Sequence, residues 1–172
     1  MEKIAVIVRK VIAEHKTILA DFKSLEKVGN DAIALKAIEQ GKEVFMPGRL
    51  NSSEGLKKFE EIRVKLDTGL RNHFHWEEVT LLDAFNEYRA FSLVPALKKL
   101  MSEHDTIREG LGELKGLTEE LQSERLSHQM WEPKGYEIRA FITRLFKTVE
   151  NHALNEQVIL NDLLKQSLNN TN

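Results

Sequence analysis

Apolar residues recur along most of the chain at alternating steps of three and four positions, which is the spacing of one face of an α-helix. The first stripe runs from Ile4 to Leu25 and is followed by Gly29, a residue type that commonly ends helices. Residues 30–45 then carry a shorter apolar pattern. We therefore predict a long helix that stops at Gly29 and a short extra helix between it and the second long helix.

Three more stripes of the same spacing predict three further long helices. They run from Ser52 or Ser53 to Tyr88, from Ser92 to Leu121, and from Pro133 to Leu163. No sustained alternation of apolar and polar residues supports a strand. Because long amphipathic helices with narrow apolar stripes pack as bundles, we predict an all-α fold, an antiparallel four-helix bundle.

Histidine and glutamate occupy several positions of these apolar stripes. His73 and Glu77 lie four residues apart, and so do His152 and Glu156. Residues four apart on a helix face the same way, with Cβ atoms about 6 Å apart, so both side chains can serve one metal ion. The interval from His73 to His152 is 79 residues, and the interval from Glu77 to Glu156 is the same. The motif is therefore present in two copies.

Two further histidines repeat in the same manner. The sequence Glu-His-Lys-Thr-Ile around His15 resembles Glu-His-Asp-Thr-Ile around His104, at an interval of 89 residues. We interpret the chain as a single domain, residues 1–172, made of two pseudo-repeats at about 1–91 and 92–168. Each pseudo-repeat supplies one histidine and then the His-x-x-x-Glu motif.

A bundle core does not hold such residues without compensation. Burying an unpaired carboxylate costs several kcal/mol, and a pair of divalent cations would supply the missing charge. Nitrogen and carboxylate ligands suit iron, manganese, cobalt or zinc. Because six side chains cannot fill two six-coordinate ions, open positions should remain for water or a small molecule. The candidate metal ligands are His15, His73, Glu77, His104, His152 and Glu156.

Other polar and aromatic residues receive less specific roles. His75 lies only two residues from His73 and should point to another face, while His128 falls in an expected loop; both should be solvated. Glu78 is expected either beside the ligands or at the surface, and Phe74 is expected to pack in the core. No nucleophile, general base or cofactor-binding loop stands out.

Composition narrows the class of protein. The chain has 172 residues and a net charge of -2, with basic and acidic residues interspersed, so no basic surface for nucleic acid is predicted. It has no cysteine, which excludes disulfides, iron-sulfur clusters and thiolate metal sites. The short apolar run at the N-terminus is broken by charges, so we expect neither a signal peptide nor a membrane span, and a cytoplasmic protein. The oligomeric state is left open.

A lone histidine followed by His-x-x-x-Glu, repeated twice across four helices, resembles the hemerythrin-like HHE cation-binding family. Ferritin-like bundles differ, because they use Glu-x-x-His with a step of three. The resemblance implies two iron ions, oxo- or hydroxo-bridged, with manganese or zinc as alternatives. It also implies terminal histidines paired as His15 with His73 and His104 with His152, with Glu77 and Glu156 as bridging ligands.

The sequence departs from the family's oxygen carriers at one position. Those members have an additional histidine four residues from the third-helix ligand, whereas Leu100 and Arg108 lie four residues from His104 here. With one histidine fewer, the site should be more open. This favours sensing, iron handling, or peroxide or nitric oxide chemistry over reversible oxygen storage. The family's nitrosative repair proteins often carry a cysteine-containing segment, and this sequence has no cysteine.

Three functions are therefore weighed. The first is a di-iron protein that engages a small diatomic ligand, oxygen or nitric oxide, for storage, sensing or detoxification. The second is a di-iron enzyme that acts on oxygen or peroxide. The third is a metal-independent helical interaction module in which residues 30–53 contact a partner.

Overall fold

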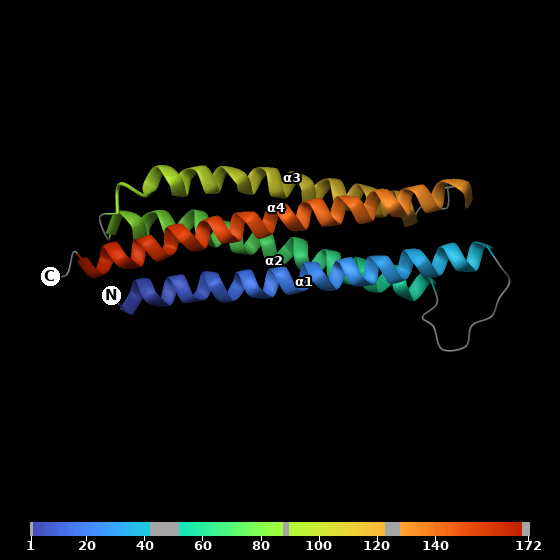
Figure 1. The fold of residues 1–172 in the computed structure, drawn as a ribbon, viewed down its shortest axis with the longest axis horizontal. Helices are drawn as coiled ribbons and strands as arrows, with labels where there is room; N and C mark the ends of the chain where they lie inside the picture. Colours follow the sequence, from blue (N-terminus) through green and yellow to red (C-terminus); the bar gives the residue numbers. More distant parts are fainter. Residues whose placement is uncertain (1, 42–51, 88–89, 123–127, 170–172) are drawn as a thin grey trace.

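Four long helices form the whole of the regular structure in the computed structural model, which describes residues 2–41, 52–87, 90–122 and 128–169 (Figure 1). In chain order they are α1 (Glu2–Gly41), α2 (Ser52–Glu87), α3 (Val94–Gln122) and α4 (His128–Asn169). Both α1 and α3 pack against α2 and α4, so the helices form a closed ring around one core. The predicted all-α four-helix bundle is confirmed, and the described residues contain no strand.

The predicted end of the first helix at Gly29 is wrong, and so is the separate short helix at 30–45. Helix α1 continues without a break through Gly29 to Gly41, and residues 42–51 lie outside the described part of the chain. A Cβ atom added at Gly29 would lie 3.0 Å from Cε2 of Phe59 on α2 and 3.7 Å from Cδ1 of Ile142 on α4. This glycine therefore serves close helix packing and does not end the helix.

The start of the last helix also differs from the prediction. Helix α4 begins at His128, which was expected in a loop, and it contains Pro133. Because a proline lacks only its own N–H, and Pro133 lies within the first two turns, the helix forgoes few backbone hydrogen bonds there. Helix α3 begins at Val94, two residues after the predicted cap Ser92, and the predicted stripe residue Tyr88 lies outside the described residues.

The apolar stripes line the interior, and their buried residues form two separate clusters. The terminal cluster lies at the end of the bundle where both chain termini are found (Figure 1) and includes Ile4, Val8, Leu81, Phe85, Leu97 and Leu160. The distal cluster includes Phe22, Leu25, Phe59, Leu66, Leu114 and Ile142. The predicted metal ligands belong to neither cluster and lie between them along the helices. Across the described segments, every helix is too polar to cross a lipid bilayer.

Replacing two helical glycines should separate helix propensity from packing. No atom lies within 4 Å of a Cβ added at Gly112 on α3, so Gly112→Ala should raise the free energy of unfolding by about 1 kcal/mol through helix propensity alone. Gly29→Ala gives the same gain in helix propensity, but its methyl group must displace the Phe59 ring. Urea denaturation should therefore show a smaller gain, or a loss, for Gly29→Ala; equal gains would contradict the close packing.

Candidate metal centre

Six polar side chains from all four helices meet in one layer between the two apolar clusters. We call them the polar layer: His15 of α1, His73 and Glu77 of α2, His104 of α3, and His152 and Glu156 of α4. All six are buried, and none is more than 7% exposed. The structure thus brings together every residue that the sequence singled out as a candidate ligand.

The ligand atoms of the polar layer fall into two groups, each able to hold a metal ion. One group consists of His15, His73, Glu77 and Glu156, and the other of Glu77, His104 and His152; in each, the ligand atoms lie within 4.8 Å of one another. Glu77 belongs to both groups, so its carboxylate stands between two adjacent positions. Glu156, which the family resemblance implies as a second bridge, belongs only to the first group.

The donor atoms approach closely without forming hydrogen bonds. His73 Nε2 lies 2.8 Å from Glu77 Oε1, and His15 Nε2 lies 3.1 Å from Glu156 Oε2. The buried atoms left without a hydrogen-bond partner include His15 Nε2, His73 Nε2, His152 Nε2, both carboxylate oxygens of Glu77, and Glu156 Oε2. Because an unsatisfied buried polar atom costs about 1–3 kcal/mol, their convergence fits residues arranged around a cation.

The opposite nitrogen of three of these imidazoles is held by a carboxylate from the preceding helix. The Nδ1–carboxylate distances are 2.7 Å from His73 to Glu14, 2.9 Å from His104 to Glu78, and 3.1 Å from His152 to Glu103. A carboxylate accepts the Nδ1 proton and so fixes the tautomer in which the Nε2 lone pair faces the centre. These carboxylate–histidine pairs are the arrangement that commonly supports histidine ligands around a metal ion.

Comparison with known protein families decides what kind of domain this is. The profile described as the hemerythrin HHE cation binding domain matches residues 6–164, from the first turns of α1 almost to the end of α4. The chain belongs to the hemerythrin HHE cation-binding family. The resemblance seen in the sequence is thereby confirmed, and membership implies that the chain binds a metal cation. No match was found among curated proteins or solved structures.

At the point where oxygen carriers of the HHE family have an extra histidine, this domain has a different arrangement. Arg108 donates from Nη2 to Glu78 Oε1 at 2.8 Å and from Nη1 to Asp105 Oδ1 at 2.9 Å. Leu100, on the other side of His104, is buried apolar. Arg108 thus acts on the carboxylate that holds His104 and contributes no ligand of its own.

Three residues that contact the proposed ligands were not assigned this role from the sequence. Glu14 and Glu103 each precede a lone histidine, so the repeated Glu-His pair was a signal that could have identified them. Phe74 was assigned to packing, and it does pack, but against the histidines themselves: its ring stacks on His104 with centroids 4.0 Å apart and meets His152 edge-on at 5.8 Å. Phe74 therefore restricts how these imidazoles can rotate.

The sequence has two further histidines. His75 is exposed, as predicted. His128 is the first residue of α4, and its side chain lies outside the described part of the chain. Glu78 was predicted beside the ligands or at the surface, and its contacts to His104 and Arg108 place it beside the ligands.

Burial and neighbouring charges separate the two carboxylates of the polar layer. Burial raises the pKa of Glu77 to about 8, and the nearby His104 only partly opposes this. Burial also disfavours ionisation of Glu156, but His15, together with His152 and His73, outweighs it and leaves the pKa lowered. Burial lowers the pKa of His152, so this imidazole is kept neutral, as a metal ligand must be. Around neutral pH the metal-free layer thus favours one ionised and one protonated carboxyl.

Replacing Glu77 by glutamine should make the metal-free protein more stable, and increasingly so at higher pH. The folded-state pKa of about 8 lies above the ordinary value of 4.5. The free energy of unfolding therefore falls as pH rises from 4.5 to about 8, because the unfolded chain releases this proton more readily than the folded protein does. Glu77→Gln mimics the neutral acid, and its gain in unfolding free energy should be larger at pH 9 than at pH 6. Urea denaturation in the presence of a chelator measures this gain. The exposed Glu113→Gln is the control; equal gains for Glu77→Gln at both pH values would contradict the burial argument.

Proposed function

We propose that this HHE domain holds two iron ions and engages a small diatomic molecule, oxygen or nitric oxide, in sensing, storage or detoxification. The observation that carries the proposal is the pair of buried donor groups that share Glu77. A ligand set of imidazole and carboxylate without thiolate suits iron, while manganese or zinc would also be accepted. Metal ions bound here would supply Lewis acidity and redox chemistry.

The two groups suggest a ligand assignment for each ion. His15 and His73 would bind one ion, and His104 and His152 the other, with ring centroids 4.8 Å and 4.9 Å apart within the pairs. Glu77 would bridge the ions. Glu156, which lies against His15, would bind the first ion and serve as the second bridge implied by the family.

Open coordination positions and apolar walls support a small uncharged ligand. The six proposed ligands cannot fill two octahedral ions, and Arg108 is engaged with Glu78 and Asp105 where oxygen carriers have another histidine. A narrow pocket beside the histidines is lined by the apolar residues Leu70, Phe74, Val149 and Ala153, among others. Such walls favour oxygen or nitric oxide over a large or charged substrate.

Binding is favoured over catalysis by the roles of the buried groups. Of the buried polar residues in the described part of the chain, all but Arg63 and Thr118 are proposed ligands, and those two bind Glu60 and the Leu114 carbonyl. An enzyme acting on oxygen or peroxide remains the second candidate because the open positions permit it. The interaction module is the third candidate: residues 30–41 of its proposed contact segment continue α1, and no observation on them points to a partner.

Metal content tests the ligand assignment. Protein purified under air should contain two irons per chain by mass spectrometry, and chelation should lower the melting temperature because the ions bind only the folded state. His152→Ala should lose one metal equivalent and also melt lower. His75→Ala, which changes an exposed histidine two residues from His73, should change neither quantity. Unchanged metal content in His152→Ala would show that this histidine is not a ligand.

Ligand challenge of the iron-loaded protein distinguishes binding from catalysis. Azide and nitric oxide should shift its near-ultraviolet and visible absorption, because both can enter the open positions. Peroxide turnover should stay close to that of free iron if the protein is a carrier or sensor. Turnover far above free iron, with saturation by peroxide, would favour the enzyme.

A further inference from the structure

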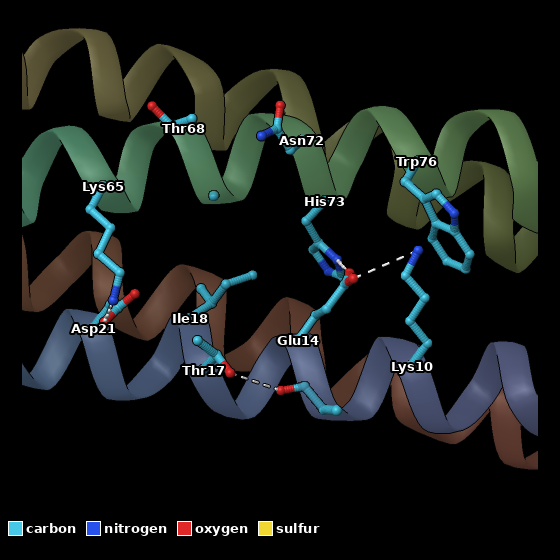
Figure 2. A pocket seen from close by; sticks show the side chains of 12 residues that line it. Lys10, Glu14, Thr17, Ile18, Asp21, Lys65, Thr68, Asn72, His73 and Trp76 are labelled. Atoms are coloured by element: carbon cyan, nitrogen blue, oxygen red, sulfur yellow. Dashed lines mark hydrogen bonds and ion pairs between the residues drawn. The ribbon is translucent and has the colours of Figure 1, made fainter.

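A groove of about 790 Å³ runs along the outer face between α1 and α2 and reaches the polar layer (Figure 2). In Figure 2, His73 from α2 and Glu14 from α1 meet midway along the groove. Lys10 covers the Trp76 ring at 3.7 Å on one side, and Lys65 binds Asp21 at 2.7 Å on the other. The groove thus opens directly onto a proposed metal ligand.

Small side chains on the facing surfaces of the two helices keep the groove open. Ala13 and Thr17 on α1 face Thr68 and Gly69 on α2 along its walls. A Cβ atom added at Gly69 would have no atom within 4 Å, although the residue lies in the middle of a helix. A larger side chain at Gly69 would therefore project into open space and narrow the groove.

Among the described residues, two line both the groove and the narrow pocket beside the histidines. They are Ile18 and His73. His15 and His152 line the inner pocket but not the groove. The inner walls stand too close together to admit even a water molecule, so passage requires a side chain to move. His73 is held by Glu14 through Nδ1, whereas Ile18 has no polar group that could fix it. Of these two side chains, Ile18 is the one that can be displaced without breaking a polar contact, although it is only 6% exposed.

We propose that the groove between α1 and α2 is the route by which an uncharged diatomic molecule reaches the centre, and that Ile18 controls the rate of passage. The proposal rests on the proposed function of the centre. The corresponding position in the second pseudo-repeat differs in exposure. Ile107 occupies the place of Ile18 in the second copy, yet it is 0% exposed and lines neither the groove nor the inner pocket.

Rates of nitric oxide binding to the anaerobic ferrous protein, measured by stopped flow, test the route. Ile18→Ala should speed association several-fold, and Ile18→Phe and Gly69→Leu should slow it several-fold. Dissociation should change in the same direction as association, so that Kd changes far less than either rate. Ile107→Ala and Gly112→Leu are matched controls, since they make the same changes on α3 and should leave both rates unchanged. Ile18→Val, which removes one methyl group, should also speed association, and it replaces Ile18→Ala if that variant folds poorly.

A second readout needs no metal. Diethyl pyrocarbonate modifies accessible imidazoles, and peptide mass spectrometry gives the rate for each histidine. In metal-free protein, Gly69→Leu should slow modification of His73, and Ile18→Ala should speed modification of His15, which lies behind Ile18. Gly112→Leu and Ile107→Ala should do neither, and the exposed His75 should react equally in all variants.

The two readouts separate the proposals. If nitric oxide binds but its rates are unchanged in the Ile18 and Gly69 variants, the route is wrong and the function stands. If neither nitric oxide nor oxygen binds, the proposed function is wrong, and the modification rates alone decide whether the groove leads to the histidines. Modification rates that are the same in all variants would overturn the route in that case as well.

Discussion

The structure depends on burying six polar side chains in one layer between two apolar clusters. Without a cation, the layer leaves several nitrogen and carboxylate oxygen atoms unsatisfied, and burial holds the pKa of Glu77 near 8. A core tolerates such a layer only when an added positive charge compensates the desolvation of the carboxylates. Burial of the two apolar clusters stabilises the bundle, and this stabilisation outweighs the cost of burying the polar layer. The polar layer therefore lowers the stability of the metal-free fold, and a bound metal cation would compensate for this loss.

The same helix packing that closes the bundle also orients the centre. Glu14, Glu78 and Glu103 each reach from one helix to a histidine on the next, so the register of neighbouring helices fixes the tautomer of three of the four imidazoles. Phe74 restrains two of the rings by direct contact. A sliding of one helix past another would consequently disturb ligands on both. This coupling explains why a centre made of four separate helices can be preorganised without any loop contributing to it.

The two halves of the sequence repeat the ligands and, at His73 and His152, the carboxylate that holds them, but the exposure of the neighbouring isoleucines differs. Ile18 borders an open groove, while its counterpart Ile107 is fully buried. The sequence signal for the repeat is strong because metal ligation restricts residue type and spacing. The groove depends instead on the small residues that face each other across α1 and α2, and their spacing has no recognisable period. Symmetry of the ligands therefore does not imply symmetry of access.

The sequence by itself determined the helical class, the buried stripes and the six candidate ligands, because helical periodicity and the repeated His-x-x-x-Glu motif are local patterns. It misplaced the helix end at Gly29 and the helix start at Pro133, where tertiary packing and position within the helix outweigh the usual meaning of these residues. Only the tertiary structure decided which carboxylate holds which histidine, that Glu77 stands between two donor groups, and where the centre opens to solvent. These features depend on distances between residues on different helices, and such distances are set by the packing of whole helices.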